Sequence, residues 1–403
     1  MRILLVGGGG REHALAWRLT QSPAVTAIFA SPGNPGIAEL GNCLPPPSTF
    51  AGYTDLALRY GVDLTVVGPE TPLVAGIVDE FRSRGLPIVG PTQAAARLEG
   101  SKSFAKAFFG RAGIPTARCS RNMNDFSFPV VIKADGLAAG KGVVIARNQA
   151  EAEDAVRRLG PDPVIEEYLD GEEVSFIGLS NGRDLVPFLP TQDHKRLLDG
   201  DEGPNTGGMG SYVDRRILSP AQTSQVLYKI MLPAIAQMRQ EGTPFTGFLY
   251  AGLMMTANGP KVLEFNARLG DPETQVIMDQ FPGDLAQLLA SSAREGALVM
   301  PASSDDCSVC VVLAAAGYPD QPRTGDLIYG VDEAEATGAR IFHAGTKQIG
   351  NHLVTNGGRV LGVTASGSTL REAIDATYRA VAKIHFDGMQ YRTDIGQRGL
   401  RRW

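Results

Sequence analysis

Polar and hydrophobic residues alternate at the start of segment 262–273, which reads Val-Leu-Glu-Phe-Asn-Ala-Arg-Leu-Gly-Asp-Pro-Glu. Alternation of this kind predicts a strand with two different faces. The face toward a core would carry Leu263, Phe265 and Ala267. The opposite face would carry Glu264, Asn266 and Arg268. A carboxylate and an amide oxygen two residues apart are ligands that Mg²⁺ accepts, and an adjacent arginine suits a phosphate that the metal also contacts.

The alternative for this segment is a half-buried strand whose polar face is simply solvated. The way the strand ends favours a site instead. Gly270 predicts a turn, Asp271 an N-cap, and Pro272 the first position of a helix that continues through residues 274–278. Because the arginine stands just before this sharp exit, we predict a metal–phosphate site.

The N-terminal residues predict a unit that can hold a phosphate. A buried strand at residues 3–6 runs into four glycines at 7–10 and then into a helical pattern at 11–17. The bare backbone and the helix N-terminus of such a unit bind phosphates. The dinucleotide fingerprint, however, needs a third glycine where His13 stands and an acid after the next strand, where residues 31–33 are Ser-Pro-Gly. A phosphate-bearing substrate or a structural turn is therefore favoured over NAD.

A second helix and strand follow at residues 54–60 and 64–67, and residues 88–91 predict the last strand of this region. Strands that alternate with helices imply a parallel sheet, and ligands bind at the ends of its strands. Glu70 lies at one such end, where its carboxylate could accept hydrogen bonds from sugar hydroxyls. A structural role in a proline-bounded turn is the alternative, and the sequence leaves both open.

A lysine beside a glycine-rich hairpin predicts a cover for nucleotide phosphates. Gly-Ser-Lys at 100–102 opens a helix at 103–111, and a strand at 128–133 ends in Lys133. The glycine-rich loop 134–142 then joins a second strand, 143–146. This is not a Walker P-loop, because that pattern continues into a helix and has Ser or Thr where Gly142 stands.

Residues 164–176 predict an apolar strand that becomes acidic at Glu166 and Glu167 and resumes after a turn. The backbone of such a segment could form hydrogen bonds with adenine, and one of its acids could bind ribose hydroxyls. The alternative is an edge strand with charged residues. Residues 192–210 are charged and then glycine-rich, so we expect a long ordered loop with a function. A helix at 220–239 and a hairpin turned at Asn258-Gly259 follow.

Composition indicates an ordinary globular protein. The chain has 403 residues, 43% hydrophobic content and a formal charge of −5, which gives no electrostatic case for nucleic-acid or anionic-membrane binding. Its four cysteines are too few for disulfides to hold together a chain of this length. Cys307 and Cys310 lie in an apolar run typical of a buried strand. No segment predicts a secretory signal or a membrane span, so we expect a cytoplasmic protein.

Taken together, the Gly-Ser-Lys motif, the hairpin after Lys133, the Glu-Glu-Tyr-Leu hinge at 166–169 and Glu264-x-Asn266 resemble the ATP-grasp ligases. Further motifs resemble one family among them, the phosphoribosylamine–glycine ligases of purine biosynthesis. These motifs occupy residues 9–15, 192–196, 205–210, 268–273 and 391–396. The resemblance implies that ATP phosphorylates the glycine carboxylate and that the amine of 5-phospho-β-D-ribosylamine attacks the acyl phosphate. It requires no protein nucleophile, so catalysis is positioning and charge neutralisation.

The resemblance also implies roles for individual residues. The metal, Mg²⁺ or Mn²⁺, is held by Glu264 and Asn266. Residues implied to contact ATP are Lys102, Lys133, Glu166, Glu167, Leu169 and Glu173. Residues implied to contact the other substrates are Gly8, Gly9, Gly10, Arg11, Glu70, Asp193, Lys195, Gly208, Gly210, Arg268, Gly345, Thr346 and Arg392. Those implied to act in catalysis are Lys133, Asp193 and Arg268.

Within these sets, the two lysines offset phosphate charge, the backbone at Glu167 and Leu169 faces adenine, and Glu173 binds ribose. Asp193 is expected to bind the glycine ammonium, and the loop 207–210 its carboxylate. Arg268 is expected to steady the acyl phosphate as charge develops.

The expected fold is α/β, in part α+β. It has an N-terminal parallel-sheet domain (1–101), a central ATP-grasp region (102–300) with a small mobile ATP lobe (about 120–187), and a C-terminal α/β cap (301–403). We expect a monomer. Two alternatives stay open: a different ATP-grasp ligase or carboxylase, such as one that activates bicarbonate, and an ATP-binding regulatory module without chemistry. A dehydrogenase is disfavoured by the incomplete fingerprint.

Overall fold

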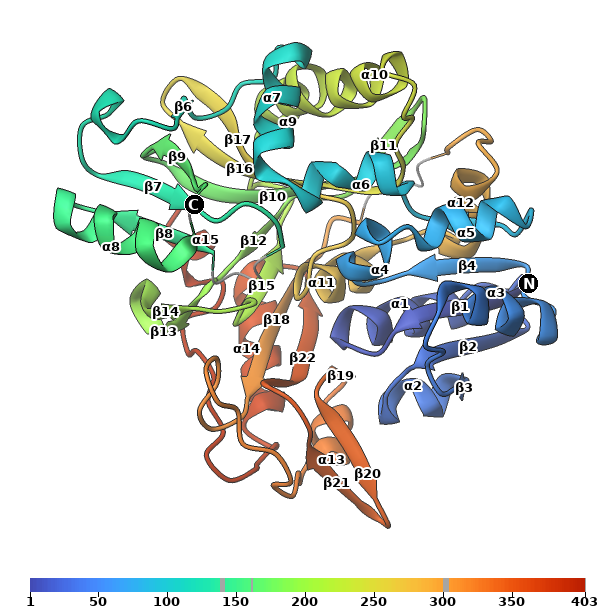
Figure 1. Ribbon diagram of the computed structural model, residues 1–403. Helices are drawn as coiled ribbons and strands as arrows, with labels where there is room; N and C mark the ends of the chain where they lie inside the picture. The colour runs from blue at the N-terminus through green and yellow to red at the C-terminus, as the bar shows by residue number, and fades with distance from the viewer. Residues whose placement is uncertain (138–141, 161, 300–303, 403) are drawn as a thin grey trace.

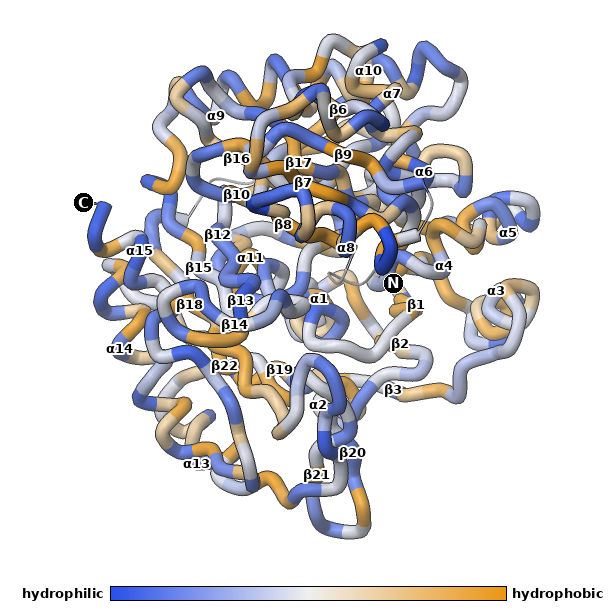
Figure 2. The backbone as a smooth tube through the Cα atoms, turned by 60° about the vertical axis from the view of Figure 1, so that its left-hand side comes forward, coloured by the Kyte–Doolittle hydropathy of each residue, from blue (hydrophilic) through white to orange (hydrophobic). Residues whose placement is uncertain are grey.

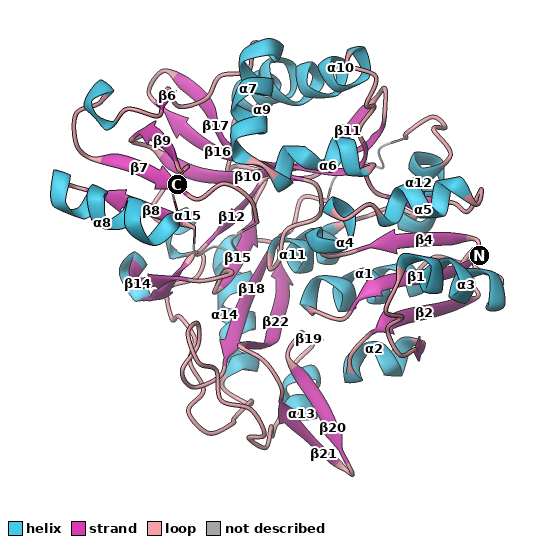
Figure 3. Cartoon of the chain, viewed as in Figure 1, coloured by secondary structure: helices cyan, strands magenta, loops and turns pink. Residues whose placement is uncertain are grey.

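The computed structural model describes residues 1–137, 142–160, 162–299 and 304–402 (Figure 1). An N-terminal parallel sheet, a small antiparallel sheet and a large central sheet make up an α/β protein (Figure 3), so the expected fold class is confirmed. The expected hairpin loop 134–142 includes Ala138 to Lys141, which lie outside the described residues, as do residues 300–303 at the expected start of the C-terminal domain.

The N-terminal sheet has five parallel strands in the order β3-β2-β1-β4-β5. Its strands are β1 (Arg2–Gly7), β2 (Ala27–Pro32), β3 (Asn42–Cys43), β4 (Leu64–Val67) and β5 (Ile88–Val89). The helices of this region are α1 (Gly10–Thr20), α2 (Pro35–Leu40), α3 (Phe50–Arg59), α4 (Glu70–Val74), α5 (Ile77–Ser83), α6 (Gln93–Gly100) and α7 (Lys102–Ala112). Because β1 and β4 end at the same edge, the glycine turn before α1 and the turn before α4 lie side by side.

The small sheet has four strands in the order β6-β9-β7-β8 and is antiparallel. Its elements are β6 (Cys119–Ser120), the 3₁₀ turn Met123–Asp125, β7 (Val130–Lys133), β8 (Val143–Ala146), α8 (Gln149–Leu159) and β9 (Val164–Glu167). Val130, Ile132 and Ile165 pack on Ala152 and Ala155 of α8 to form a separate small core.

The central sheet has nine strands in the order β17-β16-β10-β12-β15-β18-β22-β19, with β11 beside β10. Its strands are β10 (Glu172–Asn181), β11 (Leu185–Pro187), β12 (Thr191–Asp193), β15 (Gly210–Val213), β16 (Thr246–Thr256), β17 (Gly259–Asn266), β18 (Cys307–Ala314), β19 (Arg340–His343) and β22 (Arg359–Gly367). Since β15 pairs with β18, the C-terminal strands extend the central sheet, and β10 pairs in this sheet although it falls inside the expected ATP lobe. The domain boundaries stay a prediction.

Two small hairpins and the remaining helices complete the chain. The hairpins are β13 (Arg196–Leu198) with β14 (Glu202–Asn205), which flank a 3₁₀ turn at Asp199–Asp201, and β20 (Thr346–Ile349) with β21 (His352–Thr355). The helices are α9 (Pro220–Val226), a π-helical turn (Leu227–Met231), α10 (Leu232–Gln240), α11 (Glu273–Gln280), α12 (Leu285–Ala293), α13 (Val331–Glu335), α14 (Leu370–Val381) and α15 (Gln397–Leu400). The segment at 192–210 is ordered as expected, but the expectation of a loop is wrong, because short strands pair its backbone along most of its length.

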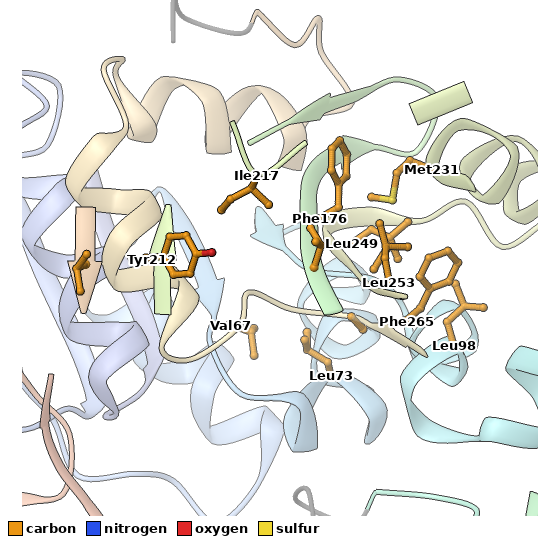
Figure 4. Close-up of a cluster of buried hydrophobic side chains, with 14 of the residues drawn as sticks. Val67, Leu73, Leu98, Phe176, Tyr212, Ile217, Met231, Leu249, Leu253 and Phe265 are labelled. Carbon is orange, nitrogen blue, oxygen red and sulfur yellow. The ribbon is translucent and has the colours of Figure 1, made fainter. Parts of the chain in front are cut away.

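One hydrophobic core joins the large sheets. Figure 4 shows Phe176, Leu249 and Leu253 of the central sheet close to Phe265 of β17 and Leu98 of α6. The same cluster reaches Val67 in the N-terminal sheet and Val309 in β18. In Figure 2 hydrophobic residues follow the central strands, while the chain end at the C-terminus is hydrophilic. No helix in the described part of the chain is long and apolar enough to cross a membrane.

All four cysteines are free. Cys307 and Cys310 are buried on β18, and burial raises the pKa of each thiol to about 12. Their burial agrees with the expectation that these two residues are core thiols.

Candidate active site

A cleft of about 1610 Å³ opens between the N-terminal sheet, the small sheet and the central sheet. Pockets for one drug-sized ligand occupy roughly 300–1,000 Å³, so this cleft has room for more than one small molecule. The residues expected from the sequence that line it are Arg11, Glu70, Lys102, Lys133, Glu166, Glu167, Leu169, Glu173, Asp193, Lys195, Glu264, Asn266 and Arg268.

The strand β17 carries the polar residues as expected, but not with regular alternation. Glu264 pairs with Gly252 and Val262 with Leu253, so Leu263 is an extra residue in a β-bulge. Val262 and Phe265 are both in the core although they are three positions apart, an odd spacing that would put them on opposite faces of a regular strand. The expected core position of Leu263 is therefore wrong: its side chain lines the cleft, and its carbonyl accepts a hydrogen bond from Lys133 Nζ at 3.0 Å.

The exit from β17 also differs from the expectation. Helix α11 begins at Glu273 after Pro272, and Asp271 does not cap it. Instead the Asp271 carboxylate accepts hydrogen bonds from the backbone N–H of Arg11 at 3.2 Å and from Gln275 Nε2 at 2.9 Å. Asp271 therefore joins the turn after β1 to α11.

Glu264 and Asn266 suit a divalent cation. Burial acts to raise the pKa of Glu264, but Lys195, Lys133 and Lys102 outweigh it and hold that pKa below the ordinary value. Within the described ranges this ionised carboxylate forms no ion pair shorter than 4 Å, and no cluster of three or more His, Cys, Asp or Glu side chains fit for a metal occurs there. A site with two protein oxygens fits Mg²⁺, which takes one or two carboxylates and completes its shell with phosphates and water.

Two lysines share one buried carboxylate at the end of β7. Glu166 Oε2 lies 2.9 Å from Lys133 Nζ, and Glu166 Oε1 lies 2.9 Å from Lys106 Nζ. The three side chains are almost fully buried at the edge of the cleft. The resemblance implies an ATP contact for Glu166, which stays a prediction; in the structure its carboxylate pairs with the two lysines.

Lys102 lies at the start of α7, where Ser101 is the N-cap. Its Nζ donates to the Gly136 carbonyl at 2.8 Å, and its backbone N–H donates to Asp135 Oδ1 at 2.7 Å. Burial lowers the pKa of Lys102, against the nearby carboxylate of Glu264. The helix terminus is thus tied to the first residues of the glycine-rich loop.

Two acidic residues that flank the turn between β9 and β10, Glu167 and Glu173, form ion pairs. Glu167 accepts from the Arg118 backbone at 3.0 Å, from Arg118 Nε at 2.9 Å and from Lys261 Nζ at 3.0 Å. Glu173 Oε2 lies 2.7 Å from Lys195 Nζ. Lys195 lowers the pKa of Glu173, and Glu173 in turn raises the pKa of Lys195 well above its ordinary value against the effect of burial.

Asp193 and Glu273 form a pair of neighbouring acids at one end of the cleft. Burial, and then the charge of Glu273, raise the pKa of Asp193 well above its ordinary value. Its Oδ1 is buried without a hydrogen-bond partner among the described residues. Ser175 donates to Glu273 Oε1 at 3.1 Å and lies 2.8 Å from the Tyr250 hydroxyl. A buried carboxyl group with one unpartnered oxygen next to a second acid suits a small cation.

Gly208 explains why the glycine-rich loop can pass so close to this pair. Its φ is +115°, and an added Cβ would lie 2.5 Å from Pro272 Cδ and 2.9 Å from Asp193 Oδ1. A side chain at this position would collide with Pro272 and with the Asp193 carboxyl group.

Arg268 is held by two carboxylates. Its Nε lies 3.3 Å from Glu70 Oε2 and its Nη2 lies 3.2 Å from Glu99 Oε1, while Nη2 also donates to Asn266 Oδ1 at 3.3 Å. Burial raises the pKa of Glu99, and Arg268 lowers the pKa of Glu70 although burial opposes it. The structure thus gives Glu70 a protein partner at the end of β4.

Arg11 extends from α1 to the same place. Its Nε lies 2.7 Å from Glu12 Oε1, and its Nη1 donates to the Leu269 carbonyl at 3.0 Å. The glycines before it are tightly packed, since a Cβ on Gly8 would lie 2.3 Å from the Gly33 carbonyl. Arg11 lines the cleft, but Gly8, Gly9 and Gly10 do not.

Several expected substrate residues lie outside the cleft lining: Gly208, Gly210, Gly345, Thr346 and Arg392. Arg392 is buried in ion pairs with Asp394 at 2.7 Å and Asp201 at 2.9 Å. Gly345 packs on the backbone of Gly357, and Thr346 Oγ1 lies 3.1 Å from His343 Nδ1. Direct substrate contact by these residues stays a prediction.

The charged residues of the cleft that the sequence predictions did not single out include Lys106, Glu99 and Arg359. Lys106 follows Lys102 by four residues, so both stand on one face of α7, a signal that the sequence contains. Glu99 ends α6, and Arg359 Nη1 donates to the Gly207 carbonyl at 2.6 Å from the far end of the sheet. No short-range pattern connects these two residues to β17.

Models of one protein family match most of the chain. The N domain of phosphoribosylglycinamide synthetase matches residues 1–99, its ATP-grasp (A) domain matches residues 100–274, and its C domain matches residues 308–398. The phosphoribosylamine–glycine ligase of Ralstonia nicotianae is 49% identical over 100% of both chains. That of Streptomyces coelicolor is 48% identical over 98% of each.

Solved structures show the same relation. The crystal structure of phosphoribosylamine–glycine ligase from Thermotoga maritima covers 98% of this chain and 100% of its own, with 36% identity and a TM-score of 0.85. The biotin carboxylase domain of 2-oxoglutarate carboxylase from Hydrogenobacter thermophilus covers 97% of this chain and 91% of its own, with a TM-score of 0.71. At 16% identity the second likeness shows the fold alone.

Proposed function

The chain belongs to the phosphoribosylamine–glycine ligase family, and on this premise we propose that its cleft joins glycine to 5-phospho-β-D-ribosylamine through a glycyl phosphate. The protein is an ATP-dependent carbon–nitrogen ligase of purine biosynthesis, and its family uses ATP with a divalent metal. One observation carries the assignment of the cleft: an open, ionised Glu264 stands beside Lys102, Lys133 and Lys195.

The divalent metal, Mg²⁺ or Mn²⁺, would be held by Glu264 and Asn266, and when bound it would offset charge on the ATP phosphates. Lys102 and Lys133 would donate to phosphate oxygens from the ends of α7 and β7. The backbone at Glu167 and Leu169 would face adenine, and Glu173, which pairs with Lys195 in the cleft, would bind the ribose.

Glycine would bind with its ammonium at Asp193 and Glu273. Because the pKa of Asp193 is raised in the free cleft, an arriving cation would favour its ionised form and the proton would leave Asp193. The glycine carboxylate takes the γ-phosphoryl group of ATP and releases ADP. The amine of phosphoribosylamine then attacks the acyl carbon, the C–O bond to phosphate breaks, and the amide forms with loss of a proton.

Arg268 would stabilise the charge that develops on the transferred phosphoryl group. Its guanidinium is fixed by Glu70 and Glu99, so it needs little reorganisation during the reaction. Glu70 and Arg11 would line the phosphoribosylamine subsite, close to the glycine turn after β1.

The function is tested by ADP and phosphate release with ATP, Mg²⁺ and glycine, with and without phosphoribosylamine generated in place from ribose 5-phosphate and ammonia. We expect release that depends on both substrates. Release with bicarbonate in place of glycine would instead indicate a carboxylase with the same fold.

The proposal extends to the state of the protein. We infer a monomer in the cytoplasm, with small molecules as its partners. Sedimentation equilibrium across a range of protein concentrations tests the monomer, and a mass that rises with concentration toward twice that of the chain would contradict it.

A further inference from the structure

Lys106 is a buried cation that has no donor left for a ligand. Its Nζ lies 2.9 Å from Glu166 Oε1, donates to Thr116 Oγ1 at 2.7 Å and donates to the Ala117 carbonyl at 3.0 Å. A lysine ammonium has three donors, so all of them are used inside the protein. Lys106 borders the cleft but is not built to contact what binds there.

Lys133 is arranged differently. Its Nζ lies 2.9 Å from Glu166 Oε2 and donates to the Leu263 carbonyl at 3.0 Å, which accounts for two donors among the contacts of the described residues. The third donor is available to the cleft that Lys133 lines. That carbonyl belongs to the extra residue of the bulge in β17.

The charges of this group do not cancel. One carboxylate, Glu166, serves two ammonium groups, so the three side chains carry a net positive charge at the edge of the cleft. If Lys106 were absent, the carboxylate would have Lys133 as its only cation in a poorly solvated place. It would then hold Lys133 more strongly and cancel its charge before ATP arrived.

We propose that Lys106 is a positioning residue: by binding Glu166 it leaves the charge and the third donor of Lys133 free for the ATP phosphates. This inference rests on the proposed function, in which Lys133 contacts those phosphates. Lys106 itself does not contact ATP and acts only through its ion pair with Glu166.

The test compares ATP, which carries the phosphates, with adenosine, which lacks them, by isothermal titration calorimetry. Lys106→Gln keeps a polar side chain next to Thr116 but removes the charge. We expect its Kd for ATP to rise about tenfold, the effect of one charged hydrogen bond, with the Kd for adenosine near that of the wild type. In Lys106→Gln/Glu166→Gln both the extra cation and the carboxylate are gone, so we expect ATP affinity to recover.

Lys261→Met is the matched control, because Lys261 pairs with the neighbouring Glu167 and lies outside the cleft lining. Its affinity for ATP should match that of the wild type. Equal losses for ATP and adenosine in Lys106→Gln, or a double variant no tighter than the single one, would overturn the inference.

Lys133→Met separates this inference from the proposed function. If it weakens ATP binding while Lys106→Gln does not, the role of Lys133 stands and only that of Lys106 is overturned. If Lys133→Met binds ATP as the wild type does, the phosphate contact is wrong and the inference is overturned with it. Thermal unfolding by circular dichroism shows whether each variant is folded.

Discussion

Two ion clusters line the cleft, one with two cations for one carboxylate and the other with two carboxylates for one cation. In the first, Lys106 and Lys133 share Glu166. In the second, Glu70 and Glu99 share Arg268. The first cluster has a surplus of positive charge and the second a surplus of carboxylates. The comparison teaches that burying a cation does not by itself make it a phosphate ligand, because the number of acids around it decides how much charge reaches the cleft.

The clusters differ in rigidity as well. The guanidinium of Arg268 is held by two carboxylates and by Asn266, and the fork geometry of arginine makes such an arrangement stiff. Lys133 has one acid and one carbonyl, so its ammonium can follow a ligand. We therefore expect the lysine cluster to govern ATP affinity and the arginine cluster to govern the rate of the chemical step.

The largest effect is expected at Glu264, which feels both clusters through Lys133 and Arg268. In Glu264→Gln the metal loses its charged ligand, and we expect kcat for ADP formation to fall by about 10²–10³-fold while the protein stays folded. A coupled ADP assay measures kcat, and circular dichroism checks the fold. Turnover near that of the wild type would refute the metal assignment.

Arg268→Lys is expected to come second. Lysine keeps the charge but cannot bridge Glu70 and Glu99, so we expect kcat to fall about 10²-fold with little change in KM for ATP. Arg111→Lys is the matched control, since Arg111 binds Glu241 through two nitrogens on the exposed surface. If KM for ATP rises and kcat does not change, the division of roles between the clusters is wrong.

The smallest effect is expected at Glu167. Like Glu166, this carboxylate pairs with two cations, here Arg118 and Lys261, but the Arg118 side chain is mostly exposed to solvent. Burial opposes the shift, but hydrogen bonds from Arg118 and Lys261 lower the pKa of Glu167 to about 2. A depressed carboxylate pKa stabilises the folded state above the unfolded pKa, and this is lost as pH falls from about 4.5 toward 2.

Glu167→Gln should therefore lower the free energy of unfolding at pH 7 by no more than about 1 kcal/mol, because solvent screens this pair. The difference from the wild type should shrink as the pH falls through that window. Urea unfolding at a series of pH values measures it. A difference that does not change with pH would show that the ion pairs contribute nothing and that packing alone is affected.

Local patterns in the sequence predicted much of the site. Glu264, Asn266 and Arg268 share the cleft because their alternation begins after the bulge at Leu263, and α7 begins at the Gly-Ser-Lys motif as predicted. The bulge itself was not predicted, because Leu263 looks like any apolar residue of a strand. Its position depends on pairing with β16, which is a tertiary property.

Long-range pairs account for the remaining differences. Asp271 fits an N-cap by local rules, but Arg11 and Gln275 take its carboxylate. Arg392 looks like a free cation near the C-terminus, yet Asp201 and Asp394 bury it. Gln275 and Asp394 are near their partners in sequence, but Arg11 and Asp201 are far away in the chain, and no periodicity of 2 or 3.6 residues reports such distant pairs.

The bulge at Leu263 sets a limit on changes in chain length. Removing one residue elsewhere in β17 would reverse the faces of every residue on one side of the deletion. Removing Leu263 would instead give a regular strand in which Val262 and Phe265 still face the core and Glu264 still faces the cleft. What would be lost is the carbonyl that accepts from Lys133. Deletion of Leu263 would therefore separate two functions of β17. Metal binding needs only that Glu264 and Asn266 face the cleft, whereas the positioning of Lys133 needs the extra residue.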